Sequence, residues 1–304
     1  MKFLKPLKNL TLAALSCTLL MAFMEGPAVT NVSSSNNSAA EMYEMNLDKL
    51  PHVIFWRKIM NLHKDSCIVN VHGERKILAT MYAPEWSNMQ LSSKDRILDS
   101  FRRMHGILDT PRIVSTMGKS FFYTFEKISP KIPMGMKEFE KNGVDGWYAK
   151  AILLIESPNQ LQKSTAGAYG PFQLMKGVAR NYGLKINRKV DERANFKRSA
   201  YAASQLIKTV CIPYAEQMLQ ARGISTNHEE LWFKLFVMHI YNAGAGNVRM
   251  ALDAIPQPGN GIELIKQLWN TNAGRFQSAS QNYSQLIIAA FLEYEERVEK
   301  KAGR

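Results

Sequence analysis

Cysteine is scarce in this sequence of 304 residues, which contains only Cys17, Cys67 and Cys211. Three cysteines cannot supply the dense disulfide framework of small secreted domains. No set of histidine, cysteine and acidic residues has the spacing of metal ligands, so we expect no metal site. Cys17 lies in an N-terminal apolar run, and the other two are expected to be buried free thiols, although a disulfide between them stays open.

The sequence also lacks the usual marks of a nucleic-acid-binding protein. It has no zinc-finger spacing, no aromatic RNA-binding motif and no concentrated basic helix. Its formal net charge is nevertheless +13 and its pI about 9.6. Such a charge favours a general attraction to an acidic matrix, and ordinary surface solubility explains it equally well. We expect no nucleic-acid partner, and a loose association with a membrane surface stays open.

Long apolar runs are absent except near the N-terminus, where one extends from Leu10 to Met24 behind three lysines. This run is short for a membrane span, so residues 1–28 are predicted to be a signal peptide. Leu15-Ser16-Cys17 is similar to a lipoprotein cleavage site, but most of the apolar run still follows it. We therefore expect an exported protein of the periplasm or cell envelope, with a lipid anchor or an uncleaved anchor as less favoured alternatives.

The remaining chain divides by composition. Residues 31–40 are small and polar, so residues 29–45 are predicted to be a flexible linker. Residues 46–135 predict a mostly helical N-terminal extension, in which a small hairpin is placed near His72. From Ser92 onward the apolar residues recur at helical spacing, so the predicted fold class is mainly α. Residues 299–304 form a basic tail.

The most informative stretch runs from Trp147 to Tyr182, and its centre is Glu156. The apolar run before the glutamate predicts a helix that buries most of its circumference and ends at Glu156. Apolar surroundings and the negative end of the helix dipole both favour the protonated carboxyl that general-acid chemistry requires. Taken alone, however, a glutamate at a helix end is usually a solvated one.

The residues after Glu156 indicate a site rather than a core. A Ser-Pro pair at 157–158 is expected to end the helix. The small residues from Ser164 to Gly170 allow the backbone to approach a ligand closely. Pro171 is predicted to open a second helix that ends near Gly183.

Three separated motifs resemble the lysozyme-like (SLT) domain of lytic transglycosylases, which are enzymes that cleave peptidoglycan. They are E-S at Glu156, S-x-A-G-A-x-G-x-x-Q-x-M from Ser164, and Y-N-A-G-x-G-x-V from Tyr241. The resemblance is greatest to the membrane-bound lytic murein transglycosylase D family, in which a stretch similar to Val190–Arg193 follows the second helix. It implies a lysozyme-like catalytic domain over residues 136–298.

The resemblance implies a reaction that depends on one acid. Glu156 would protonate the β-1,4 glycosidic oxygen between N-acetylmuramic acid and N-acetylglucosamine in peptidoglycan glycan strands. The C6 hydroxyl of the muramic residue would then attack C1 while Glu156 acts as the base. The product would be a 1,6-anhydro sugar, and the reaction would need no water, metal or cofactor.

The resemblance also implies a set of substrate-binding positions: Ser164, Gln173, Met175, Tyr241, Asn242 and Tyr283. The serine and glutamine would hydrogen-bond the sugar near the acid, and the methionine would form an apolar wall. The Tyr241 ring would pack on a sugar while its hydroxyl bonds the glutamate or the substrate. Simple packing is an equal alternative for Met175 and Tyr283, and Asn242 could instead cap a turn.

The sequence departs from the family pattern at three places. The segment from Glu156 to Ser164 is one residue shorter, and Pro171 and Phe172 replace the usual residues before the glutamine. Ala279 stands where a glutamate usually begins the final helix. The intact acid and the intact Tyr241 motif still favour an active enzyme.

Two alternatives remain open at this stage. One is a hydrolase on the same fold, which would need a second well-placed carboxylate, and Asp191 and Glu192 are the next acids along the chain. The other is a catalytically silent peptidoglycan-binding or scaffold protein, for which Ala279 is the best indication.

Overall fold

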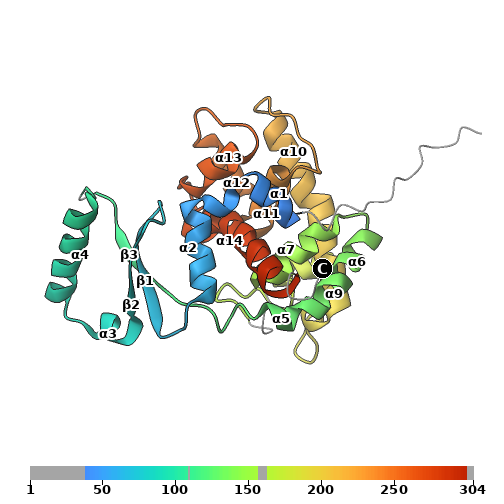
Figure 1. Ribbon diagram of the computed structural model, residues 1–304. Coiled ribbons are helices and arrows are strands. Elements are labelled where there is room, and N and C mark those ends of the chain that lie inside the picture. Colours follow the sequence, from blue (N-terminus) through green and yellow to red (C-terminus); the bar gives the residue numbers. More distant parts are fainter. Residues whose placement is uncertain (1–37, 109, 157–162, 300–304) are drawn as a thin grey trace, which may run out of the picture. The chain divides into compact units, whose positions relative to one another are not determined.

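The computed structural model describes residues 38–108, 110–156 and 163–299, and its fold is mainly α (Figure 1). The predicted signal peptide and nearly all of the basic tail lie outside these residues. Within the described ranges, no helix combines the length and the apolarity needed to cross a membrane.

The chain from Ser38 corrects the predicted linker. Helix α1 (Ser38–Glu44) occupies the end of the range 29–45, and its Ala39 and Met42 are buried in the main core. The Tyr43 hydroxyl also donates a hydrogen bond of 2.7 Å to Glu296 near the other end of the chain. Two apolar side chains one turn apart thus suffice to dock a segment whose composition is that of a linker.

A three-stranded antiparallel sheet follows α2 (Pro51–Asn61). Its strands are β1 (Ser66–Val71), β2 (Ile77–Tyr82) and β3 (Ile113–Met117), in the order β2-β1-β3. The predicted hairpin near His72 is therefore confirmed. The third strand was not predicted, and α3 (Ala83–Asn88) and α4 (Leu91–His105) lie between it and the hairpin in the chain.

The rest of the described chain is helical, as predicted. The helices are α5 (Phe125–Ile128), α6 (Ile132–Lys141), α7 (Gly146–Glu156), α8 (Lys176–Asn181), α9 (Phe196–Leu206), α10 (Ile212–Gln220), α11 (Leu231–Ala243), α12 (Ala245–Asp253), α13 (Ile262–Trp269) and α14 (Ser278–Tyr294). A π-helical segment, Ile207–Cys211, separates α9 from α10. Pro213, which cannot donate a helical hydrogen bond, lies two residues after it in the first turn of α10.

Helix α7 lies at the centre of the main core. Every residue from Gly146 to Ile155 is buried, as expected for a helix that is apolar on all sides. At its N-terminal end the Asp145 carboxylate accepts a hydrogen bond from the Trp147 amide at 2.8 Å and pairs with Lys234 of α11 at 2.6 Å. The indole of Trp147 stacks on Phe291 of α14, with the ring centroids 5.3 Å apart. Helices α11 and α14 thus fix α7 in position.

The predicted helix from Pro171 is wrong in its first turn. Residues 171–175 form a turn instead, in which Tyr169 and Leu174 exchange two backbone hydrogen bonds of 3.1 Å, and α8 begins only at Lys176. Gly170 causes this turn because its φ of +87° lies in the left-handed region, and a side chain there would overlap the Arg193 carbonyl oxygen.

Candidate active site

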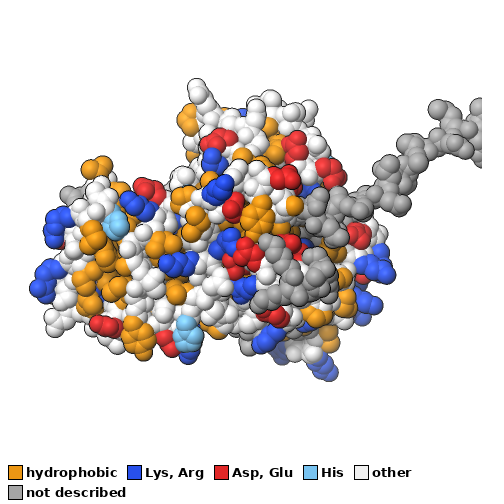
Figure 2. Space-filling model, viewed as in Figure 1, with side chains coloured by type: hydrophobic (Ala, Val, Ile, Leu, Met, Phe, Trp, Pro, Cys, Tyr) orange, Lys and Arg blue, Asp and Glu red, His pale blue; other side chains and the backbone are white. Residues whose placement is uncertain are grey.

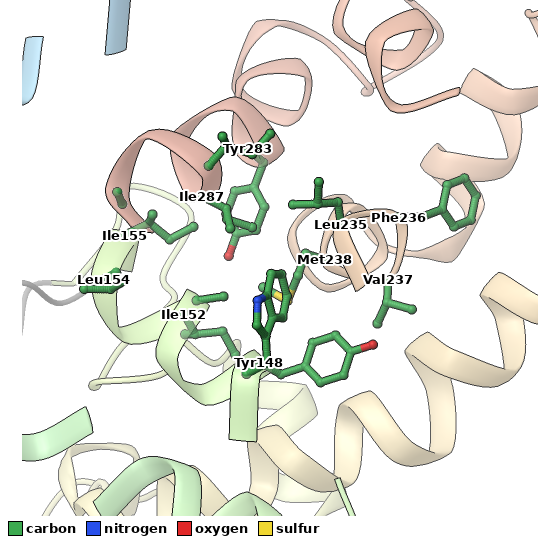
Figure 3. Packing of buried hydrophobic residues seen from close by; sticks show 14 of the residues in the cluster. Tyr148, Ile152, Leu154, Ile155, Leu235, Phe236, Val237, Met238, Tyr283 and Ile287 are labelled. Carbon is green, nitrogen blue, oxygen red and sulfur yellow. The ribbon is translucent and has the colours of Figure 1, made fainter. Parts of the chain in front are cut away.

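Glu156 is the last residue of α7, where the helix emerges from the core. Its carboxyl Oε1 accepts a hydrogen bond of 2.9 Å from the hydroxyl of Tyr283, which is only 4% exposed on α14. Figure 3 shows Tyr283 and Ile287 reaching from α14 toward the end of α7 that carries Ile155. The structure therefore brings together two of the residues that the sequence selected, from positions 127 residues apart.

The surroundings of Glu156 favour its protonated form. Burial raises the pKa of the Glu156 carboxyl above its ordinary value, and the hydrogen bond from Tyr283 opposes this rise in pKa. No second carboxylate among the described residues contributes to the shift. Desolvation thus favours the neutral acid, while the Tyr283 hydroxyl is placed to stabilise its anion.

Three tyrosines lie close enough to Glu156 for the charge of its carboxylate to influence their titration. Burial, together with the charge of Glu156, raises the pKa of Tyr123, of Tyr241 and of Tyr283 well above the usual value. All three phenols are therefore neutral at physiological pH. Tyr123, from the segment before α5, was not selected by the sequence analysis, because only the folded chain brings its aromatic run to Glu156.

The loop from Ser164 to Met175 carries three of the predicted substrate-binding residues. The Ser164 hydroxyl accepts a hydrogen bond from the Ala168 amide at 2.9 Å, and the Gln173 side-chain amide donates to the Gly170 carbonyl at 3.0 Å. Gln173 also holds a left-handed φ of 45°. Met175 is 46% exposed, which excludes the alternative that it is a core residue.

Arg193 holds both ends of this loop and was missed as a site residue. Its side chain is buried, and its Nη1 donates to the carbonyls of Gly167 and Leu174, each at 2.9 Å. Its Nε and Nη2 bind the two carboxylate oxygens of Asp191 at 2.9 and 2.7 Å. The motif at 190–193 is thus a brace for the loop, and a buried arginine in an exposed-looking polar stretch gave no sequence signal.

Tyr241 and Asn242 lie in the last turn of α11. The Tyr241 hydroxyl donates to the Phe172 carbonyl at 2.6 Å rather than to Glu156, so the tyrosine that bonds the acid is Tyr283. Asn242 is exposed, and it is not the residue that caps this helix end. The side-chain amide of Asn247 caps it instead, by donating to the Ala243 carbonyl at 2.7 Å. Gly244 then makes the turn into α12 with a φ of +81°.

The acids that follow Glu156 in the chain are engaged elsewhere. Pairing with Arg193 lowers the pKa of the Asp191 carboxyl. Glu192 accepts a hydrogen bond of 2.7 Å from the Lys185 amide, which lowers its pKa. Ala279 is exposed in the first turn of α14, one turn before Tyr283.

A carboxyl whose pKa is raised by burial, at the end of a buried helix and hydrogen-bonded by a tyrosine, is suited to general acid–base chemistry. Among the described residues, no cluster of histidine, cysteine and acidic side chains could hold a metal ion. Cys67 and Cys211 are both buried and free, as predicted. The described part of the chain therefore presents Glu156 and Tyr283 as a candidate acid–base pair on a helical domain.

The comparison with known families agrees with this class of site. Residues 135–258 match the family described as the Transglycosylase SLT domain, so this part of the chain is similar to that domain. The match indicates lytic transglycosylase activity in general and peptidoglycan as the substrate; it does not distinguish the D family. No curated protein matches the chain. Tyr123 and Tyr283 both lie outside the matched range.

Proposed function

We propose that the protein is a peptidoglycan lytic transglycosylase that cleaves the β-1,4 bond between N-acetylmuramic acid and N-acetylglucosamine and forms a 1,6-anhydro end. Glu156 is the general acid and then the general base. The observation that carries this proposal is the half-buried Glu156 carboxyl, which lies within the matched range and accepts a hydrogen bond from the Tyr283 hydroxyl 2.9 Å away.

The first step needs a proton on the carboxyl. Burial supplies this condition, because it raises the pKa of Glu156. The proton passes from Glu156 to the glycosidic oxygen as the bond to C1 breaks, and the N-acetyl group of the substrate can stabilise the developing positive charge. Tyr283 then donates its hydrogen bond to the newly formed carboxylate.

The second step needs a base of moderate strength. The same raised pKa makes the Glu156 carboxylate a competent acceptor for the proton of the C6 hydroxyl, whose oxygen attacks C1. The proton gained restores the starting acid, so the cycle balances without water. Ser164, Gln173, Met175, Tyr241 and Asn242 are proposed to bind the glycan strand around this centre.

A hydrolase on the same fold is the second candidate, and the described residues disfavour it. Inverting hydrolysis requires a second carboxylate to activate water. Both carboxylate oxygens of Asp191 accept hydrogen bonds from the Arg193 guanidinium, and the Glu192 carboxylate accepts one from the Lys185 amide. Residues 157–162, which follow the acid, contain no aspartate or glutamate. These observations support chemistry with a single acid.

Export to the periplasm or cell envelope is part of the proposal, because peptidoglycan lies outside the cytoplasmic membrane. The apolar run behind three lysines supports it, and the net charge of +13 suits an acidic polymer matrix.

The test is mass spectrometry of the muropeptides that the protein releases from purified peptidoglycan. We expect 1,6-anhydro ends from the wild type and none from Glu156→Gln. Glu192→Gln is the matched control, since it removes a neighbouring acid that is bonded away from the site, and it should still release anhydro products. Ordinary reducing ends, one water heavier, would make the protein a hydrolase. Binding without release by any of the three proteins would leave the scaffold alternative.

A further inference from the structure

Helix α14, which carries Tyr283, has two faces that contact different parts of the protein. Tyr283, Ile287 and Phe291 are directed to one side, where Tyr283 meets Glu156 and Phe291 stacks on Trp147. Asn282, Gln285 and Glu293 recur at helical spacing on another side. Figure 1 shows α14 between α7 and α2 of the N-terminal extension, so the second face meets the extension.

The extension binds this second face along its whole length. Trp56 of α2 donates its indole N–H to Gln285 at 2.9 Å. Arg57 of the same helix pairs with the buried Glu293 at 2.8 Å. These contacts join residues more than 200 positions apart, and they tie α14 to a region outside the matched SLT range.

Arg75 makes the contact that is nearest to Tyr283. It follows the β1–β2 turn, is only 6% exposed, and donates from Nη2 to the Asn282 side-chain oxygen at 2.8 Å. Its guanidinium lies over the rings of Phe55 and Trp56, 5.0 and 5.3 Å from their centroids. Asn282 directly precedes Tyr283 in α14, so the Arg75 guanidinium is bound next to the residue that carries the tyrosine hydroxyl.

Burying Arg75 in this way is costly, which indicates a purpose beyond packing. Arg75 holds a left-handed φ of 56°, which a residue with a side chain adopts at some strain. None of the described carboxylates forms an ion pair with it, and two asparagines accept its hydrogen bonds instead.

We propose that Arg75 is a positioning residue of the active site: by holding Asn282, it fixes the first turns of α14 and keeps the Tyr283 hydroxyl on the Glu156 carboxyl. The N-terminal extension is then a functional part of the site rather than an appendage. This inference rests on the proposed function only in giving Glu156 its role, because the contact itself exists in the enzyme without substrate.

The hydrogen bond from Tyr283 lowers the pKa of Glu156 against the effect of burial. Its loss must therefore raise that pKa further. The other groups that face Glu156 are Tyr123, from the segment before α5, and Tyr241 of α11. Both are neutral phenols over the working pH range, so neither titrates with the acid or hides its shift.

The experiment is a titration of the Glu156 carboxyl by ¹³C NMR on glutamate-labelled full-length protein without substrate. The signal absent from Glu156→Gln assigns the resonance. We expect Tyr283→Phe to raise the pKa of Glu156 by about one unit, the scale of one hydrogen bond to a charged group. Arg75→Met should give at least about half of that rise, and Asn282→Ala, which removes the same contact from the other side, should give a similar rise.

Arg57→Met is the matched control. It removes another arginine contact between α2 and α14, in which a half-buried arginine pairs with the buried Glu293, ten residues beyond Tyr283. We expect it to lower the melting temperature and to leave the pKa of Glu156 unchanged. The melting temperatures of all variants establish that each is folded during the titration.

A rise with Tyr283→Phe but none with folded Arg75→Met and Asn282→Ala would overturn the proposal. Equal rises with Arg57→Met and Arg75→Met would also overturn it, since α14 would then respond to any loosening. Shifts for the Arg75→Met and Asn282→Ala pair that simply add in the double variant would show that the two do not act through one contact. Because no turnover is measured, an inactive wild type would refute the proposed function and leave this result intact.

Discussion

Helices α7 and α4 have similar lengths but opposite surroundings. Helix α7 is buried from Gly146 to Ile155, whereas no residue of α4 is fully buried. Helix α4 presents only one stripe, including Ile97, Leu98 and Phe101, to a small separate core around Cys67 and Trp86. Figure 2 shows hydrophobic side chains at the surface over the sheet and α4. Glu156, the proposed catalytic acid, thus lies in the more constrained of the two regions.

The extension itself is divided by this difference. Its inner part, α2 and the β1–β2 turn, contacts α14 through Trp56, Arg57 and Arg75. Its outer part, α3 and α4, packs mainly on the second core. Changes in the inner part are therefore expected to reach the active site, and changes in the outer part are expected to remain local.

The largest effect that separates the two regions should come from Leu153→Ala in α7. Leu153 is fully buried, and its Cδ1 lies where a side chain on Gly135 of α6 would be, so the two helices cannot close the cavity by approaching each other further. We expect a loss of about 4 kcal/mol in the free energy of unfolding. Urea denaturation measures it, and a loss below about 1 kcal/mol would show that α7 is less constrained than described.

The next effect concerns pH and the buried His239 of α11. Burial lowers the pKa of His239 to about 4, with the Ser280 backbone opposing, while its Nε2 hydrogen-bonds Ser284 at 2.9 Å. The pKa of His239 in the folded protein lies below its ordinary value of 6.5. Above pH 6.5 the histidine is therefore neutral, and its contribution to the free energy of unfolding is fully present. That contribution is lost as the pH falls from 6.5 toward 4, by up to about 3 kcal/mol.

The measurement is urea denaturation between pH 7.5 and 4 for the wild type and for His239→Leu. The difference between the two proteins cancels the other titrating groups. We expect the stability of the wild type, relative to that of the variant, to fall across this window. A constant difference would mean that His239 titrates normally in the folded protein.

A smaller effect is expected at the loop brace. Arg193→Met removes the guanidinium donors to the Gly167 and Leu174 carbonyls and to the Asp191 carboxylate, and leaves backbone amides as the donors to Leu174 and Asp191, which should lower stability by about 2 kcal/mol. The loop that carries Ser164 and Gln173 would also loosen, so we expect KM for glycan strands to rise more than kcat falls. Arg198→Met is the control, because its pair with Glu192 is half exposed and should contribute less than about 1 kcal/mol. An unchanged KM for Arg193→Met would separate the brace from substrate binding.

Part of this molecule was predictable because the information is local. The apolar run before Glu156 predicted a helix that ends at this residue, which is α7. The loop after Gly170 was not predictable as a turn, because its conformation depends on the Arg193 carbonyl and guanidinium, which are distant in the chain.

The same reason explains the residues of the site that were missed. Tyr123 lies in a loop and Arg75 lies in the loop of a hairpin. The local sequence pattern of each stretch gives no indication of a distant partner. Their proximity to Glu156 and Asn282 is a product of tertiary packing, which no periodicity in a single sequence reveals. The third strand β3 follows a similar rule, since its five residues pair only with β1, more than 40 positions earlier.

The smallest effect should come from α4 and completes the comparison. Leu98→Ala removes the same atoms as Leu153→Ala, but Leu98 is only partly buried against the second core. We expect a loss of about 1 kcal/mol, because water and neighbouring side chains can fill the space left behind. The pKa of Glu156 and the release of anhydro products should not change. A loss as large as that of Leu153→Ala, or any shift of the acid's titration, would mean that the outer part of the extension is coupled to the active site as strongly as the inner part.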